Sequence, residues 1–308
     1  MAKKPAILLT IDVEDWFQVE NFKSYIDFST WNCFGLRVEK NTCLILDLLD
    51  AFSFKPKATF FMLGWIAEKL PGLVRQIRDR GHEVASHGAN HHLCTALDQN
   101  QLFQDLLTSK KQLEDITGHA VYGYRAPSFA LNDRILERIK QAGYLYDSSY
   151  NSFSAHGRYG SIDLSKAVKN GGSYQLDTHF FELPVSNLRL CNKTIPLGGG
   201  GYFRLYPTSF FKQGIKNVLK KDNAFIFYAH PWEFDPDQPR VHQASRGFKF
   251  RHYINLDKTE GKLKQIINSF SNCDFVTCRR YLEEYRNFQY PAPSTQHLTA
   301  RPKGAKFM

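Results

Sequence analysis

The sequence predicts an α/β fold built on a mostly parallel sheet. In the first half of the chain, short apolar runs alternate at least four times with segments of helical periodicity, which indicates βαβ units. Several apolar runs end directly on charged side chains, as happens where the carboxyl ends of parallel strands line a common crevice. With 308 residues, 43% of them hydrophobic, the chain can also bury a substantial core.

The expected elements follow one another along the chain. The opening strand, Ile7–Ile11, is an unbroken run of apolar and β-prone residues, typical of a strand buried on both faces. Further strands are expected at Lys57–Leu63, His82–Ser86, Val121–Tyr124, Tyr144–Asp147, Phe180–Val185, Ala224–Ala229 and Phe275–Val276. Helices are expected at Val38–Phe52, Ile66–Arg80, Leu102–Thr117, Asn132–Ala142, Tyr206–Lys220 and Thr259–Ser271. Pro71 should kink or restart the second helix, because proline cannot continue the helical hydrogen bonding.

Three segments lack clear periodicity. Val19–Arg37 is aromatic and irregular, and we expect a long loop that folds over the strand ends. Ser148–Gly201 is rich in Gly, Ser and Asn, which favours loops and short strands. After about Tyr290 the chain is rich in Pro, Thr and Lys, so we expect a disordered tail.

The composition narrows the classes of partner. The net charge is +10, but the basic residues are scattered rather than gathered in blocks, so we expect no nucleic-acid partner. Such a charge suits solubility, or attraction to acidic polymers and anionic surfaces. The six cysteines form no CxxC pair and are typical of reduced thiols. No signal peptide and no transmembrane segment are expected, and the predicted location is cytoplasmic.

Three carboxylates directly follow the opening strand: Asp12, Glu14 and Asp15. Carboxylates are costly to bury unless they are paired, protonated or bound to a metal. A solvated acidic turn would explain them equally well from this segment alone. The residues further along the chain favour a site.

His87 and His91 directly follow the strand expected at His82–Ser86. Imidazole is the commonest nitrogen ligand of zinc and similar metals. Two histidines and one carboxylate would leave a coordination position open for water, which is the catalytic arrangement. A merely polar loop is the alternative, but the position at a strand end, like that of Asp12, favours the metal. We expect His92 to be an outer or surface residue.

Two later segments carry further candidates. Arg125 precedes the rigid turn at Pro127 and could be held against a carboxylate or a substrate oxygen. His230 follows the strand Ala224–Ala229 and lies near Glu233, so it is a candidate general acid, with a structural core histidine as the alternative. The glycine run 198–201 could let backbone approach a ligand closely, or could be a flexible loop.

The ordered motifs TIDVED, SHGANH, YRAPSF, YDSS and FYAHPW resemble those of the NodB-like polysaccharide deacetylases of carbohydrate esterase family four, over about residues 5–280. The likeness is greatest to the deacetylases encoded beside exopolysaccharide and exosortase-type gene clusters. It implies a distorted, incomplete (β/α) barrel of about seven parallel strands with surrounding helices. It further implies a single domain over residues 1–290, with a family-specific extension from about 150, and a disordered tail over 291–308.

The resemblance also implies roles for individual residues. By position in the motifs, Asp12 corresponds to the general base, Arg125 to the residue that orients it and His230 to the general acid. His87 and His91 correspond to metal ligands. The first motif departs from the usual adjacent aspartates, because Val13 separates Asp12 from the next acid, so the carboxylate ligand stays open between Glu14, which we favour, and Asp15. Two other departures are Gly88, where Ser or Thr is usual, and a fourth motif reduced to Asp-Ser-Ser at 147–149.

The function implied is the metal-dependent hydrolysis of N-acetyl groups on amino sugars, in a polysaccharide or its precursor, during exopolysaccharide biosynthesis. The cofactor implied is a divalent metal, zinc first, with cobalt or nickel as alternatives. The expected partner is an N-acetylated glycan, with a lipid-linked precursor and membrane-surface association as options, and a backbone amide near Ser128 could stabilise an oxyanion. Two alternatives remain: a metal-assisted amidase acting on a small cyclic amide, allantoinase-like, and an inactive carbohydrate-binding protein.

Overall fold

The computed structural model describes residues 3–153, 159–190 and 193–288, so the predicted tail over 291–308 lies outside the described residues. The strands are β1 (Ala6–Val13), β2 (Ala58–Met62), β3 (Glu83–Ser86), β4 (Gly123–Tyr124), β5 (Tyr146–Asp147), β6 (Val168–Asn170), β7 (Ser173–Asp177), β8 (Phe180–Glu182), β9 (Asn187–Leu190), β10 (Lys193–Pro196), β11 (Ala224–Ala229) and β12 (Asp274–Phe275). Ten of them form one sheet in the order β11-β1-β2-β3-β4-β5-β8-β7-β6, with β12 also paired to β1, while β9 and β10 form a separate hairpin.

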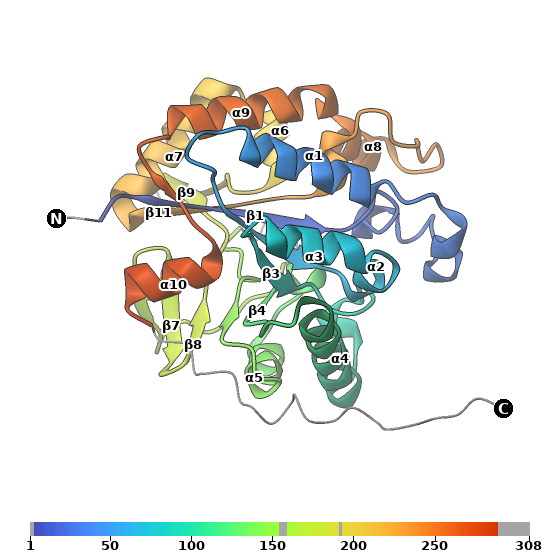
Figure 1. Ribbon diagram of the computed structural model, residues 1–308, viewed down its shortest axis with the longest axis horizontal. Helices are drawn as coiled ribbons and strands as arrows, with labels where there is room; N and C mark the ends of the chain where they lie inside the picture. Colours follow the sequence, from blue (N-terminus) through green and yellow to red (C-terminus); the bar gives the residue numbers. More distant parts are fainter. Residues whose placement is uncertain (1–2, 154–158, 191–192, 289–308) are drawn as a thin grey trace.

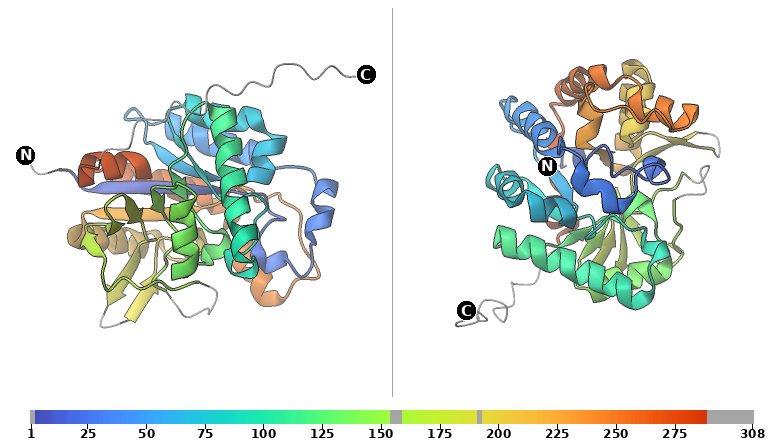
Figure 2. Two further views of the ribbon diagram at one scale, coloured as in Figure 1. Left: turned by 90° about the horizontal axis from the view of Figure 1, so that it is seen from below. Right: turned by 90° about the vertical axis from the view of Figure 1, so that its right-hand side faces the viewer.

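The sheet confirms the predicted α/β class. Each neighbouring pair from β11 through β8 is parallel, as is the pair of β12 with β1. Seven consecutive strands therefore run in one direction, in agreement with the expected number. The strands β6 and β7 extend the sheet in antiparallel fashion. The sheet curls into a half-barrel with helices packed around it (Figures 1 and 2).

The helices are α1 (Val38–Asp50), α2 (Gly64–Lys69), α3 (Pro71–Asp79), α4 (Gln99–Thr117), α5 (Asp133–Gln141), α6 (Gly200–Leu205), α7 (Thr208–Asp222), α8 (Arg246–Tyr253), α9 (Thr259–Ser269) and α10 (Cys278–Arg286). The helix expected over Ile66–Arg80 restarts at Pro71, because proline suits the first position of a helix. Helix α4 begins at Gln99 rather than Leu102, since Asp98 and Gln101 form a capping box. None of the described helices is long and apolar enough to cross a membrane.

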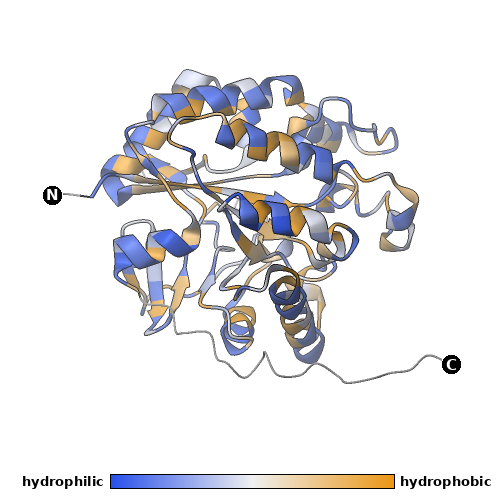
Figure 3. Ribbon diagram, in the orientation of Figure 1, coloured by the Kyte–Doolittle hydropathy of each residue, from blue (hydrophilic) through white to orange (hydrophobic). Residues whose placement is uncertain are grey.

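Three helices were not predicted. Helix α6 begins inside the glycine run, where loops and short strands were expected. Helix α8 has weak apolar periodicity, and α10 is a nine-residue helix whose sequence is mostly polar. The other helices were predictable because their sequences alternate between hydrophobic and hydrophilic residues, which Figure 3 shows as alternating bands.

Strand β1 organises the fold. All eight of its residues are buried. Strand β11 pairs along one of its edges, while β2 and β12 share the other. The carboxyl end of β1, where Asp12 lies, is therefore in the interior of the sheet rather than at an edge. The segment expected as an irregular loop after it contains two 3-10 helices, Glu20–Phe22 and Phe28–Cys33.

Candidate active site

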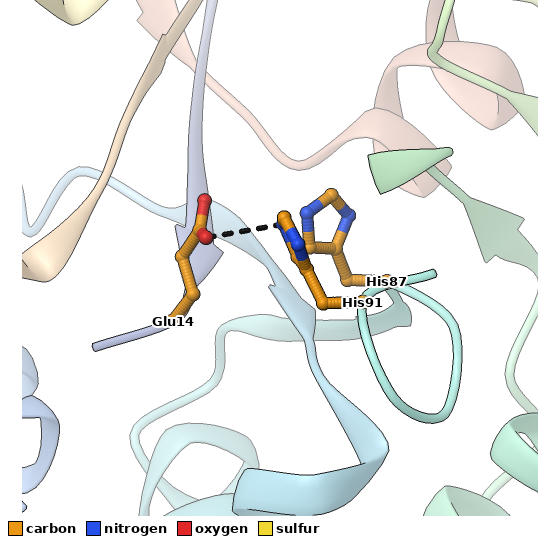
Figure 4. A group of neighbouring side chains, drawn as sticks. All are labelled: Glu14, His87 and His91. Carbon is orange, nitrogen blue, oxygen red and sulfur yellow. Dashed lines mark ion pairs between the residues drawn. The ribbon is translucent and has the colours of Figure 1, made fainter. Parts of the chain in front are cut away.

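Glu14, His87 and His91 converge at the carboxyl edge of the sheet (Figure 4). One potential ligand atom from each lies within 4.8 Å of the others, and all three residues are buried. The closest pair joins Oε2 of Glu14 and Nε2 of His91 at 3.1 Å. A group of two imidazoles and one carboxylate is the donor set of a catalytic zinc site with a position open for water.

The protonation states of these residues suit a divalent cation. The Nδ1 atom of His87 lies 2.8 Å from the carbonyl oxygen of Arg125, which can only accept, so Nδ1 carries the hydrogen and Nε2 keeps its lone pair. Burial lowers the pKa of His87 to about 4, which leaves the ring neutral. Burial alone would raise the pKa of Glu14, but His91 and His230 outweigh it and lower that pKa. In the described structure, the buried Oε2 of Glu14 also has no hydrogen-bond partner.

The loop between the two histidines depends on unusual backbone angles. Gly88 has φ of +76°, and His91 itself has φ of +56°. A Cβ at position 88 would lie 3.1 Å from Oδ2 of Asp105, the same oxygen that accepts a hydrogen bond from the amide of Ala89. Glycine at this position, unusual for the resembled family, is therefore explained by the left-handed conformation and the tight contact.

Asp15 requires a correction, because its carboxylate does not lie with the histidines. It accepts hydrogen bonds from the backbone amides of Trp16 at 2.8 Å, Arg37 at 2.7 Å and Val38 at 2.9 Å. These contacts fasten the loop that follows β1 to the start of α1. Of the two carboxylates left open as metal ligands, only Glu14 therefore belongs to the group, and Asp15 has a structural role.

Arg125 fixes the position of Asp12. The guanidinium is fully buried and donates to Oδ1 of Asp12 at 2.7 Å, and further to Thr10 Oγ1, Ser148 Oγ and the carbonyl oxygen of Ser148. Buried charges are tolerated when paired and fully hydrogen-bonded in this way. The second oxygen of Asp12, Oδ2, lies 4.0 Å from Nε2 of His230, on the side of the metal group.

His230 lies between two carboxylates. Its Nε2 atom is 3.0 Å from Oε1 of Glu14, and its Nδ1 atom is 3.6 Å from Oε2 of Glu233. Burial lowers the pKa of His230, but Glu14 first and Glu233 second outweigh this effect and raise it to about 10. The imidazole also stacks on Trp232, with ring centroids 5.1 Å apart. A positioned imidazolium of this kind can deliver a proton.

Three residues lie behind His230 in roles that were not predicted. Glu233 and Arg204 form a buried pair, with Arg204 Nε and Nη2 at 3.2 and 3.1 Å from Oε1 of Glu233. Gly200 lies against this pair: a Cβ there would be 1.8 Å from Oε2 of Glu233. Gly200 thus makes room for a buried carboxylate, while Gly201 lines the cavity. The sequence feature that could have pointed to these residues is the presence of both a glycine run and the motif HPWE.

A cavity of about 170 Å³ opens beside these groups. From the first half of the chain it is lined by Asp12, Glu14, His87, His91, Ser128 and Phe129, and from the second half by Tyr159, Tyr202, Tyr228, His230, Trp232, Phe250 and Arg251. Ser128 and Phe129 both have positive φ, and backbone strain of this kind concentrates at functional sites. The amide of Phe129 already donates to Ala126, so an oxyanion donor near Ser128 would have to be another group.

Parts of the chain are similar to known proteins. Residues 3–146 match a family model described as "Polysaccharide deacetylase", and residues 148–283 match one described as "Domain of unknown function (DUF3473)". A peptidoglycan-N-acetylglucosamine deacetylase of Bacillus cereus is 35% identical over 100 residues, which is 32% of this chain and 46% of that protein. A peptidoglycan deacetylase of Helicobacter pylori is 34% identical over 120 residues, 37% of this chain and 41% of that protein. The chain thus spans less than half the length of these curated relatives.

A crystal structure from Mycobacterium smegmatis, described as a candidate polysaccharide deacetylase, covers 100% of this chain and 96% of its own. It has a TM-score of 0.59 and 18% sequence identity. This likeness concerns the fold alone, and it confirms the expected half-barrel with surrounding helices.

Proposed function

We propose that the protein is a metal-dependent hydrolase that removes N-acetyl groups from amino sugars, and the match of residues 3–146 to the polysaccharide deacetylase family model supports this. The observation that carries this proposal is the convergence of Glu14, His87 and His91 beside Asp12 and His230 on one cavity. It combines a donor set for a divalent metal with a buried carboxylate and a protonated imidazole. The products are acetate and a free amine on the sugar.

Glu14, His87 and His91 would hold a divalent cation, zinc first, with cobalt or nickel as alternatives. When bound, such a cation would polarise the acetyl carbonyl and lower the pKa of water. Asp12 takes the proton from the attacking water. Its orientation for this step comes from Arg125, which binds Oδ1 and leaves Oδ2 toward the cavity. His230 gives its proton to the nitrogen as the bond between carbon and nitrogen breaks.

The Bacillus cereus relative acts, by its name, on N-acetylglucosamine of peptidoglycan, and the Helicobacter pylori relative is named a peptidoglycan deacetylase. This supports N-acetylglucosamine as the sugar and makes peptidoglycan one acceptor to assay. The combination of TIDVED, GYRAPSF and HPWE supports a role in exopolysaccharide biosynthesis instead. In that setting the acceptor would be an N-acetylated glycan or its lipid-linked precursor, deacetylated in the cytoplasm at a membrane surface.

Acetate release tests the proposal. The purified protein should release acetate from N-acetylglucosamine oligomers, and a His230→Ala variant should lose most of that activity, by about 10²–10⁴-fold, while keeping its fold. Allantoin serves as the competing substrate, since an amidase for small cyclic amides would cleave it and leave the oligomers intact. Release from neither substrate, nor from peptidoglycan, would favour an inactive carbohydrate-binding protein.

A further inference from the structure

An exposed apolar surface lies at the mouth of the cavity. Leu205, Phe210 and Phe250 are 45%, 41% and 59% exposed, so they present apolar area to solvent. Tyr206 links Phe210 to Tyr202, with ring centroids 5.0 and 5.9 Å apart, and Tyr202 shares the cavity lining with Leu205 and Phe250. We call these five residues the apolar rim.

The apolar rim lies on the catalytic side of the molecule. Tyr202, Leu205 and Phe250 line the cavity together with Asp12 and Glu14. Helix α6 starts directly after Gly199, which bridges to Tyr228 near the end of β11. Helix α7 then leads back to the start of β11, so Phe210, in its first turn, lies near the carboxyl edge of the sheet. The right-hand view of Figure 2 looks onto this edge, with α8 beside it.

The neighbouring helix α8 is cationic. Its sequence, RGFKFRHY, contains Arg246, Lys249 and Arg251 and no acidic residue. Within the described parts of the chain, no carboxylate forms an ion pair with any of these three cations. Besides Asp12, Glu14 and Glu233, the cavity lining includes the acidic residue Glu20, from the loop after β1, and it pairs with Lys23 at 3.8 Å.

The residues of the apolar rim favour a lipid bilayer over a glycan as the partner of this surface. A glycan seated in the cavity would not cover Phe210, because this residue is outside the cavity lining. Leu205 offers an aliphatic rather than an aromatic surface, which suits hydrocarbon better than a sugar ring. The exposed side chain of Phe250, with Arg246 and Arg251 near it in α8, offers an apolar group to the bilayer interface and cations to anionic headgroups. The net charge of +10 would also attract an anionic surface.

We propose that the apolar rim and α8 dock on an anionic lipid bilayer, with Phe250 and Leu205 entering the interface and Arg246, Lys249 and Arg251 contacting lipid headgroups. The docked protein turns the mouth of its cavity toward the membrane surface. This proposal deepens the function proposed above, on which its biological purpose rests: the acetylated sugar would be presented at that surface. Lipid binding itself can be measured without any catalysis.

The experiment is co-sedimentation of the full chain with vesicles. Vesicles of phosphatidylcholine with one third phosphatidylglycerol should bind the protein, and vesicles of phosphatidylcholine alone should bind it much more weakly. Binding should fall as salt rises from about 50 mM to about 500 mM, because the charge attraction is screened. Each of Arg246→Glu and Lys249→Glu should weaken binding by about five-fold or more, since one cation near such a surface contributes about 1 kcal/mol.

Further variants test how much the apolar side chains contribute to vesicle binding. Phe250→Ser should weaken vesicle binding by about five-fold or more. The matched control is Leu190→Ser, because Leu190 is 58% exposed but lies on β9, outside the apolar rim. In addition, Phe250→Trp should show a blue-shifted emission with anionic vesicles. Melting temperatures near that of the parent would show that all variants are folded.

The proposal is overturned if the parent protein does not bind anionic vesicles at low salt, or if Leu190→Ser weakens vesicle binding as much as Phe250→Ser does. It is also overturned if Phe250→Ser leaves vesicle binding intact and slows acetate release only from long glycans, which would make the rim a glycan platform. Failure of acetate release with intact vesicle binding would reject the proposed activity and not the docking surface.

Discussion

Replacing Gly200 with alanine should disturb the site through one added methyl group. The new Cβ would be 1.8 Å from Oε2 of Glu233, whereas ordinary contacts begin near 3.4 Å. The carboxylate cannot retreat freely, because it is 2% exposed and held by Arg204 and by the backbone amide of His230 at 3.1 Å. Forcing it away therefore strains the packing and weakens a buried ion pair.

The size of the effect follows from these two contributions. Overpacking costs about 1–3 kcal/mol, and breaking a buried pair completely costs about 3–5 kcal/mol. A destabilisation of about 3 kcal/mol is therefore expected for Gly200→Ala, which in a chain of 308 residues lowers the melting temperature by about 5 °C. Because His230 loses the carboxylate behind it, kcat should fall by about 10²-fold, with KM changed little.

Gly201→Ala is the matched control for stability. A Cβ at this position meets nothing within 4 Å, and alanine in a helix is more favourable than glycine by about 0.5–1 kcal/mol. Its melting temperature should equal or exceed that of the parent by calorimetry. If Gly200→Ala melted and turned over substrate like the parent, the reasoning that Glu233 is pinned behind His230 would be refuted.

Three further predictions concern buried charged groups of the sheet and its edge. Asp12→Asn should reduce acetate release by about 10²–10⁴-fold with a native circular dichroism spectrum, and near-normal turnover would exclude Asp12 as the base. Arg125→Met should destabilise the fold by about 3–5 kcal/mol in urea titrations, because it strands the buried carboxylate of Asp12, and an unchanged midpoint would contradict that pairing. Burial first, and Asp147 second, raise the pKa of Glu182 in the folded protein. At pH values above the ordinary pKa of glutamate, the folded state therefore binds more protons than the unfolded state. Stability should therefore fall as pH rises from about 5 to about 8, and Glu182→Gln, which cannot ionise, should show a flatter profile; identical profiles would contradict the shift.

Much of the fold was predictable because it follows from local patterns. The run of buried residues in β1 and the alternation of strands and helices after it depend only on sequence periodicity. The break at Pro71 follows from the missing amide of proline. The helices α8 and α10 were not predictable in this way, because their polar sequences are held by packing against distant segments.

The candidate site, like the fold, was predictable from the sequence only in part. His87, His91 and Asp12 follow strand ends, so the parallel topology was enough to bring them together. The choice between Glu14 and Asp15 depended on a loop contact with residues 37 and 38, which the spacing of the acids does not contain. The role of Gly200 depended on a carboxylate 33 residues away in the chain, and only the folded structure brings the two into contact.

The central claim is that Glu14, His87 and His91 hold one divalent metal ion that serves amide hydrolysis. The most direct measurement titrates Zn²⁺ into chelator-treated protein while acetate release from N-acetylglucosamine oligomers is recorded. The account predicts no release at the start, a rise to a plateau at about one Zn²⁺ per chain, and no rise at all in a His87→Ala variant that is still folded. Full acetate release from the metal-free protein, or equal activation of the His87→Ala variant, would contradict it.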